Sequence, residues 1–246
     1  MKKLATVCSL FMLIFLYACK KDPVTKPVHF DSTTYEDLGH YSQSGKPDYL
    51  TTPDVVSQDL LSYYFETLPE GQDLRKTNPG LLTTDAIADV KIPKLSDVFI
   101  TFVYKSGAYS NSFAFYTYPT GKPPLSTKDI KEIINVFPNA GYLTPLRQGD
   151  KVKIGRFEPG TSIGFVLLQN AWDTLKHTIN SKAVHLCSND VLNPEVDPNL
   201  KKHAVLIDYP KENKVLVGFE DLDRTFPRCD HDFNDLLVYC TVTPVN

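Results

Sequence analysis

The sequence has no strongly basic stretch, and its 29 acidic residues outnumber its 26 basic ones. Proteins that bind DNA or RNA need a basic surface to displace counterions from the phosphates, so the composition argues against nucleic acid as a partner. The apolar run from Leu4 to Tyr17 is shorter than the roughly 20 residues that a transmembrane helix needs. No internal repeat is evident, which leaves one domain as the simplest organisation for a chain of this length.

The first residues have the pattern of a secretory signal peptide. Lys2 and Lys3 precede the apolar run, and a small residue follows it at Ala18-Cys19. The segment Leu16 to Cys19 is similar to the lipobox, in which cleavage before the cysteine leaves a thiol that carries diacylglycerol. We expect residues 1–18 to be a signal peptide and Cys19 to be the lipidation site; an uncut N-terminal transmembrane anchor is the alternative. Either way the chain leaves the cytoplasm, and a lipid would hold it on a membrane of the bacterial cell envelope, as an outer-membrane lipoprotein that is periplasmic or surface-exposed.

The next segments differ in composition. Residues 19–52 are rich in Pro, Thr, Ser, Asp and Lys, with few aliphatic residues, and predict a flexible tether. Residues 53–95 predict a helical segment that packs on the following domain. In it, Thr52-Pro53 has the pattern of a helix start, and Val56, Leu60, Tyr63 and Tyr64 fall on one face of a helix that ends near Pro69.

Short runs of branched and aromatic residues dominate residues 96–246. They predict strands at 98–104, 113–118, 162–168, 204–209, 214–219 and 236–242, separated by turn residues. A single helix is expected at about Thr127 to Val136. Because helices do not recur after each strand, the pattern disfavours a doubly wound parallel sheet. The predicted fold is mainly β, an antiparallel β-sandwich or jelly-roll-like domain.

Residues Gly160 to Gly164 match the G-x-S-x-G expression of the hydrolase nucleophile elbow. The elbow needs a strand before the serine and a helix after it. Here Glu158-Pro159 precedes the motif and a strand-forming run follows it. We interpret the motif as a turn that opens a strand, so the sequence offers no catalytic serine.

The strongest chemical signal lies near the C-terminus, where acidic residues flank the last predicted strand. Ca²⁺ prefers six to eight oxygen ligands, and carboxylates packed this closely repel one another unless a cation neutralises them. The spacing is not that of an EF-hand. The alternative without metal binding is that these acids cap turns and face solvent. The candidate calcium ligands are Glu220, Asp221, Asp230, Asp232, Asn234 and Asp235.

Three cysteines remain after the signal and lipid cysteines, so at most one internal disulfide can form. In an oxidising compartment a Cys187–Cys229 disulfide is the plainest pairing, with Cys240 packed in the last strand; Cys229–Cys240 is the alternative. Zinc held by His185, Cys187, Cys229 and His231 is a further alternative. His203 is interpreted as a hydrogen-bonded structural residue.

A series of motifs runs through the second half of the chain and closes on Asp232-Phe233-Asn234-Asp235; the earlier members are Asp97 to Phe102, Asn111 to Tyr118, Val136 to Ala140, Gly160 to Phe165, Ser188 to Pro194, His203 and Gly218 to Leu222. Through these motifs residues 97–243 resemble the LruC-type domain family, domain of unknown function 4114, of bacterial surface proteins. The resemblance implies an exported β-rich module without an established enzymatic activity, whose acidic signature is suspected of holding calcium. Cys229, preceded by Pro227-Arg228, departs from the polar turn expected there.

These observations favour a non-enzymatic surface lipoprotein of a Bacteroidetes-like bacterium, with a calcium-stabilised domain for adhesion. Its expected ligands are a glycan, a matrix component or a protein. A hydrolase acting on surface polysaccharide is an alternative, which a cleft with two carboxyl groups roughly 5–10 Å apart would favour. A structural subunit of a surface assembly is another, which an unpaired edge strand would favour.

Overall fold

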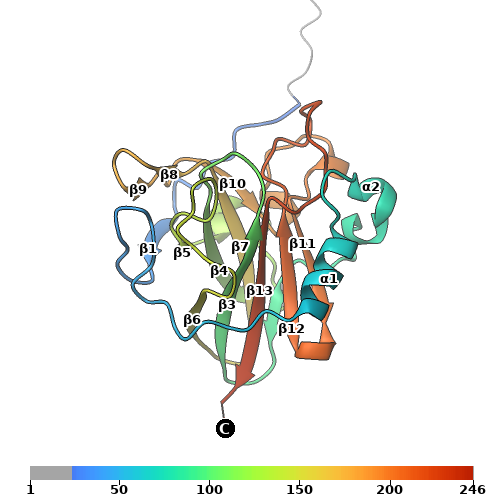
Figure 1. The fold of residues 1–246 in the computed structure, drawn as a ribbon. Helices are drawn as coiled ribbons and strands as arrows, with labels where there is room; N and C mark the ends of the chain where they lie inside the picture. The colour runs from blue at the N-terminus through green and yellow to red at the C-terminus, as the bar shows by residue number, and fades with distance from the viewer. Residues whose placement is uncertain (1–23, 246) are drawn as a thin grey trace, which may run out of the picture.

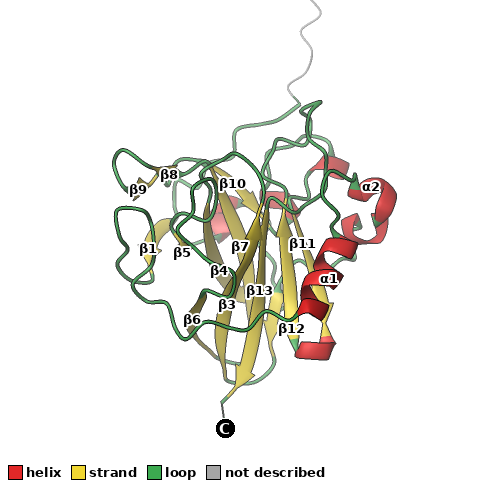
Figure 2. Ribbon diagram, viewed as in Figure 1, coloured by secondary structure: helices red, strands yellow, loops and turns green. Residues whose placement is uncertain are grey.

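The computed structural model describes residues 24–245. Two β-sheets pack face to face, and two helices lie against the outer face of one of them (Figure 1, Figure 2). The first sheet has the order β1-β5-β4-β7-β10, with β2 paired to β7, and the second has the order β11-β12-β13-β3-β6. The strands of the first sheet are β1 (Thr34–Asp37), β2 (Val90–Ile92), β4 (Ser112–Pro119), β5 (Glu132–Phe137), β7 (Thr161–Gln169) and β10 (Val184–Cys187).

The second sheet carries the C-terminal strands. Its members are β3 (Ser96–Lys105), β6 (Lys151–Phe157), β11 (Ala204–Tyr209), β12 (Lys214–Phe219) and β13 (Leu236–Pro244). A separate hairpin joins β8 (Trp172–Asp173) to β9 (Thr178–Ile179), and the helices are α1 (Gln58–Thr67) and α2 (Leu74–Thr77). Single 3₁₀ turns span Pro79–Leu82, Thr127–Asp129, Asp190–Leu192, Pro198–Leu200 and Pro210–Glu212.

The main core fills the space between the two sheets. Phe113 of β4 packs its ring 5.7 Å from that of Phe165 on β7 and 6.0 Å from that of Phe219 on β12, so aromatic contacts join the two sheets directly. Side chains alternate between the two faces of a strand, and the inward-facing ones here are almost all aliphatic or aromatic. This arrangement confirms the predicted mainly β sandwich.

All six predicted strands are present, as β3, β4, β7, β11, β12 and β13. Their branched and aromatic residues suit a pleated, half-buried surface. The pattern missed the other strands of the two sheets, β1, β2, β5, β6 and β10. These are shorter or interrupted by polar and glycine residues, so their pairing depends on neighbours that are distant in the sequence.

The helix expected at residues 127–136 is wrong. Only Thr127–Asp129 forms a single 3₁₀ turn, in which the Asp129 carboxylate accepts the Ser126 N–H at 2.9 Å. The chain then enters β5, which lies between β1 and β4. Ser126 and Asp129 therefore do cap a turn. The β-branched residues that follow are stabilised more by pairing with a strand on each side than they would be in a short helix.

Helix α1 confirms the helix predicted after residue 53, with a later start. Ser57, rather than Thr52, caps it, because the Ser57 hydroxyl accepts the Leu60 N–H at 3.1 Å. Leu60 and Tyr64 face the second sheet and are fully buried there. The Tyr64 hydroxyl donates to the carbonyl of Val238 and accepts from the N–H of Val217, which ties the helix to β12 and β13.

The expectation of a flexible tether is corrected for residues 24–52. β1 pairs in parallel with β5, and Phe30 is buried with its ring stacked 4.3 Å from that of His185. Further along, the Tyr49 hydroxyl donates to the Val136 carbonyl at 2.9 Å, and Leu50 bridges to Val152 on β6. A few well-spaced apolar residues thus suffice to dock a polar segment when a sheet edge offers hydrogen bonds.

The proposed signal peptide, the lipidation site Cys19 and the first residues of the tether lie outside the described residues. Across residues 24–245, the structure contains no helix that is long and apolar enough to cross a membrane.

Candidate metal centre

The candidate site lies where β12 ends and β13 begins. Phe219 and Leu236 are antiparallel partners, so the residues next to them stand on either side of the base of one loop, residues 220–235. Glu220, Asp221 and Asp235 bring a carboxylate oxygen each to within 4.8 Å of one another. We call these three residues the carboxylate cluster.

Hydrogen bonds hold the carboxylate cluster in place. The Asp221 N–H donates to Asp235 Oδ2 at 2.8 Å, and the Asn111 amide donates to Asp221 Oδ2 at 2.7 Å. Glu220 is completely buried; its Oε1 accepts the Leu222 N–H at 3.2 Å, whereas its Oε2 has no hydrogen-bond partner. A buried carboxylate oxygen without a partner is costly, so Oε2 is a candidate to bind a cation.

The loop between β3 and β4 covers the cluster. The Ser106 hydroxyl lies 3.2 Å from Asn234 Oδ1 and 3.5 Å from Asp235 Oδ1, which places the amide oxygen of Asn234 beside the cluster. Gly107 has a φ of +51°, and a Cβ there would come within 2.9 Å of Asp221 Oδ2. Glycine is needed at this position because the backbone is left-handed and the carboxylate is close.

The electrostatics of the cluster oppose negative charge. Burial, and then the neighbouring carboxylates, raise the pKa of Glu220 to about 7 and that of Asp235 to about 10. Burial also raises the pKa of Asp221. None of the ion pairs formed among residues 24–245 includes any of the three. A divalent cation would supply the missing positive charge.

The six predicted ligands therefore divide into two groups. Asp230 and Asp232 form a second group with Glu70, with their ligand atoms also within 4.8 Å of one another, and their charges act on Glu220. Asp232 Oδ2 accepts the Gly71 N–H at 2.7 Å, and burial raises the pKa of Asp232 to about 6. Glu70 and Asp230 are exposed to solvent.

Asp230, Asp232 and Asn234 alternate in the sequence but do not lie on an extended strand, because the intervening residues His231 and Phe233 have φ values of +60° and +61°. These left-handed residues break the alternation of an extended chain. Asn234 consequently points to Ser106 and donates its amide to the Leu68 carbonyl at 3.3 Å.

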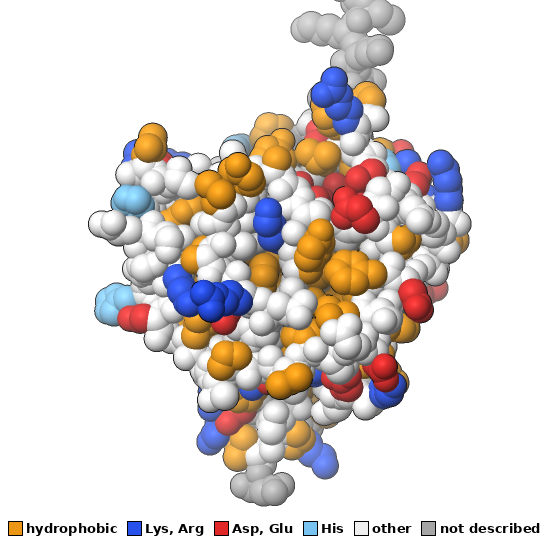
Figure 3. All heavy atoms as spheres, viewed as in Figure 1, with side chains coloured by type: hydrophobic (Ala, Val, Ile, Leu, Met, Phe, Trp, Pro, Cys, Tyr) orange, Lys and Arg blue, Asp and Glu red, His pale blue; other side chains and the backbone are white. Residues whose placement is uncertain are grey.

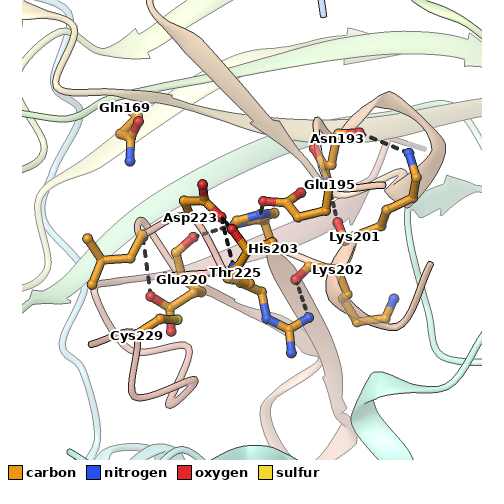
Figure 4. Close-up of polar contacts among 12 residues, drawn as sticks. Gln169, Asn193, Glu195, Lys201, Lys202, His203, Glu220, Asp223, Thr225 and Cys229 are labelled. Carbon is orange, nitrogen blue, oxygen red and sulfur yellow. Dashed lines mark hydrogen bonds and ion pairs between the residues drawn. The ribbon is translucent and has the colours of Figure 1, made fainter. Parts of the chain in front are cut away.

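A buried histidine anchors the backbone of Glu220 (Figure 4). His203 Nδ1 donates to the Glu220 carbonyl at 2.9 Å, and its Nε2 faces Glu195 Oε1 at 2.9 Å. Because a carbonyl only accepts, Nδ1 must carry a proton, and a further proton is shared between Nε2 and the carboxyl group. The interpretation of His203 as a hydrogen-bonded structural residue is confirmed.

The cysteine predictions need correction. All three cysteines among the described residues are unpaired and buried. Cys187 packs in the cluster on the outer side of the first sheet, Cys229 lies in the loop, and Cys240 packs in the core from β13, as expected. The four-ligand zinc set is not assembled either, because His185 is engaged by Phe30 and by the Tyr35 hydroxyl at 2.8 Å.

The serine motif has the expected structural role. Gly160 occupies a turn with a φ of +84°, and strand β7 begins at Thr161. Ser162 is buried within that strand, where its hydroxyl meets that of Thr120 at 3.0 Å. A strand follows the serine where a nucleophile elbow needs a helix, so the rejection of this motif as a catalytic site is sound.

Sequence reasoning missed the residues that other loops contribute. Ser106, Gly107 and Asn111 come from the connection between β3 and β4, and Glu70 follows α1. Lys105-Ser106-Gly107 is recognisable in the sequence only as a turn. Nothing local to these residues indicates that they approach a loop more than a hundred positions later.

Comparison with known proteins identifies one related family. Residues 157–243 match the model of a domain of unknown function (DUF4114). No curated protein matches the chain. No solved structure matches it either. The expected resemblance from residue 97 onward is therefore supported for its C-terminal part, which contains the carboxylate cluster. From the end of β6 to near the end of β13, the chain is similar to the family of domains DUF4114.

Proposed function

We propose that the protein is a non-enzymatic binding module whose carboxylate cluster holds Ca²⁺ and thereby fixes the loop of residues 220–235. The observation that carries this proposal is the convergence of Glu220, Asp221 and Asp235, together with the unpartnered Oε2 of Glu220. Ions of one sign that are buried together need a counter-charge, and no Lys or Arg among residues 24–245 forms an ion pair with them.

Calcium fits this donor set better than other common cations. The three carboxylates offer up to six oxygens, and Asn234 Oδ1 lies beside them. Ca²⁺ accepts about six to eight oxygens at roughly 2.3–2.6 Å, so oxygens on opposite sides of the ion lie about 5 Å apart. The three ligand atoms lie within 4.8 Å of one another, so one ion could contact all three. Mg²⁺ requires shorter distances and keeps more water.

The bound ion would organise a surface for a ligand. The front face of the molecule carries apolar side chains beside acidic ones (Figure 3). Phe65 and Tyr104 pack edge to face at 5.4 Å and are 40% and 36% exposed, and Tyr142 is 49% exposed. Exposed aromatic rings next to charged groups suit a glycan, matrix or protein ligand at the bacterial surface. A lipid on Cys19 would keep the module on the outer membrane.

Binding is favoured over hydrolysis of surface polysaccharide. Glu220 and Asp221 are buried, 0% and 2% exposed, so a polymer cannot reach them without opening the loop. General acid and base groups must lie within hydrogen-bond reach of the substrate. The raised pKa values of these carboxyl groups follow from their burial and from one another's charge, which a bound cation would offset, and they do not require acid–base catalysis.

Thermal unfolding of the chelator-treated protein tests the proposal. Ca²⁺ should raise the melting temperature, with a stabilisation that grows as the logarithm of one plus the ratio of its concentration to its dissociation constant, and Mg²⁺ should raise it less. Asp235→Asn should remove the calcium response. Asp230→Asn is the matched control in the same loop, and it should retain the response because Asp230 lies in the other acidic group. An unchanged melting temperature at millimolar Ca²⁺, or an equal response in Asp235→Asn, would reject the carboxylate cluster as the site.

A further inference from the structure

The loop above the carboxylate cluster also brings a sulfur and an imidazole to Glu220. Cys229 Sγ lies 3.2 Å from His231 Nδ1. One ligand atom from each of Glu220, Cys229 and His231 lies within 4.8 Å of the others. All three residues are buried, with exposures of 0%, 8% and 5%. We call this group the thiol cluster.

A further observation indicates that the thiol cluster accepts a ligand. Glu220 Oε2 is buried without a hydrogen-bond partner, and the Glu220 side chain lies beside Cys229, away from His203 (Figure 4). A buried carboxylate oxygen without a partner is costly, and a bound metal ion would satisfy it.

We propose that Glu220, Cys229 and His231 form a second metal site, which binds a thiophilic transition-metal ion of the Zn²⁺ class. Thiolate, imidazole and carboxylate are the three ligand types that zinc uses, at about 2.3, 2.0–2.1 and 2.0–2.2 Å. In a tetrahedral site such bonds put the sulfur and the nitrogen about 3.5 Å apart. The observed 3.2 Å requires only a small adjustment. Water would complete the fourth position.

The charge of the thiol cluster matches one divalent ion. Cys229 loses its proton on binding, so one thiolate and one carboxylate balance the charge of Zn²⁺. Burial, and then the neighbouring Glu220, raise the pKa of the Cys229 thiol well above its usual range, so without metal it stays protonated. The site therefore takes up the ion in exchange for a proton.

Arg224 competes with the metal. Its Nε donates to His231 Nδ1 at 3.2 Å and so occupies the lone pair that would bind the ion. The same guanidinium donates through Nη1 to the Lys202 carbonyl at 2.9 Å and lies 5.0 Å over the ring of Phe233, whereas its buried Nη2 has no partner. Metal binding needs only the Nε contact to open, and the Lys202 contact can keep the side chain in place.

The thiol cluster differs from the calcium site in chemistry, although the two share Glu220. Cys229 and His231 are sulfur and nitrogen donors, which Ca²⁺ does not favour, and the carboxylate cluster has neither. The second site therefore stands whether or not calcium binds. Zn²⁺ there would connect the end of β12 to the middle of the loop and brace the loop without a disulfide.

Cobalt(II) is the probe that separates the two sites, because a Co²⁺–thiolate bond gives a charge-transfer absorption band that oxygen ligands do not. We expect one equivalent of Co²⁺, added to the reduced, metal-free protein, to produce this band and one equivalent of Zn²⁺ to remove it. Cys229→Ala should abolish the band. Cys187→Ala is the matched control, since Cys187 is buried on the other sheet. Asp235→Asn should keep the band while losing any response to Ca²⁺.

The opposite results would overturn the proposal: no band at one equivalent, or a band that persists in Cys229→Ala. A measurement on the unaltered protein guards against a variant that fails to fold. Zn²⁺ should slow the alkylation of Cys229, followed by mass spectrometry, and leave the alkylation of Cys187 unchanged. Equal alkylation of Cys229 with and without Zn²⁺ would also reject the site.

Discussion

Glu220 belongs to both the carboxylate cluster and the thiol cluster. Its backbone carbonyl is fixed by His203, its Oε1 accepts from the Leu222 N–H, and its Oε2 has no hydrogen-bond partner. The residue is thus positioned by its own backbone and by one of its two carboxylate oxygens. A side chain held in this way loses little conformational freedom when an ion binds.

Asp235 offers the clearest test at the scale of one residue. Because its pKa is raised to about 10, Asp235 is protonated at pH 7 without metal, and Asn has nearly the same shape and charge as that form. We expect Asp235→Asn to leave the unfolding free energy of the metal-free protein within about 0.5 kcal/mol of the original, as for substitutions that disturb no special contact. Calcium at a hundredfold excess over its dissociation constant should stabilise only the original protein, by about 2.7 kcal/mol. Chemical denaturation with and without Ca²⁺ measures both.

Arg224 provides a second test at this scale. Replacing it by Gln removes the N–H that occupies His231 Nδ1 and a positive charge beside the ion. We expect Arg224→Gln to bind Zn²⁺ several-fold more tightly, measured by competition with a chromophoric chelator. Weaker binding in the variant would show that the guanidinium supports the site instead of competing for it.

At the scale of single elements, α1 acts as a cover for the outer face of the second sheet. Leu60 and Tyr64 pack against β12 and β13, the two strands that lead into and out of the loop of residues 220–235. The Asn234 amide also donates to the Leu68 carbonyl just after the helix ends. The position of the loop is therefore linked to the helix by packing as well as by hydrogen bonds.

Leu60→Ala should destabilise the protein by about 2–5 kcal/mol, the cost of removing a buried leucine side chain and leaving a cavity. Phe65→Ala is the control on the same helix. Phe65 is 40% exposed, so its loss should cost much less. Urea denaturation at constant pH measures the two changes, and equal losses would mean that α1 does not pack as the structure shows.

At the scale of the whole molecule, the buried acids make stability depend on pH. Glu220 and Asp232 have pKa values raised to about 7 and 6 in the folded chain, above those of an unfolded one. At pH values between the unfolded and the folded pKa values, the folded state binds more protons than the unfolded state. The unfolding free energy therefore falls as the pH rises. The stability that these groups contribute is fully present below about pH 4 and is lost by about pH 7.

Calcium should weaken this dependence on pH, because it binds the ionised carboxylates. Without metal, the melting temperature should decrease between pH 5 and pH 8; with saturating Ca²⁺ the decrease should be smaller or absent. Calcium affinity itself should increase over the same range as Glu220 loses its proton. Scanning calorimetry at several pH values, each with Ca²⁺ or with chelator, checks both expectations. Parallel curves in the two conditions would contradict them.

Several features could be predicted from the sequence alone because they depend on local composition. The branched and aromatic runs of β3, β4, β7, β11, β12 and β13 indicate strands by themselves, and a fold made mainly of strands follows. Glu220, Asp221 and Asp235 were candidates because acidic residues gather at the two ends of a short stretch before the last strand. The strand, and not a helix, that follows Ser162 could also be predicted from the sequence.

Only the tertiary structure decided which acids meet. The pairing of Phe219 with Leu236 brings Glu220 and Asp235 together, whereas the left-handed backbone at His231 and Phe233 interrupts an extended chain between Asp230 and Asn234. Docking of residues 24–52, the strand β5 in place of a helix, and the unpaired cysteines also depend on partners far along the chain. Composition determines what a segment favours, but distances between side chains are fixed only when distant segments pair and exclude water.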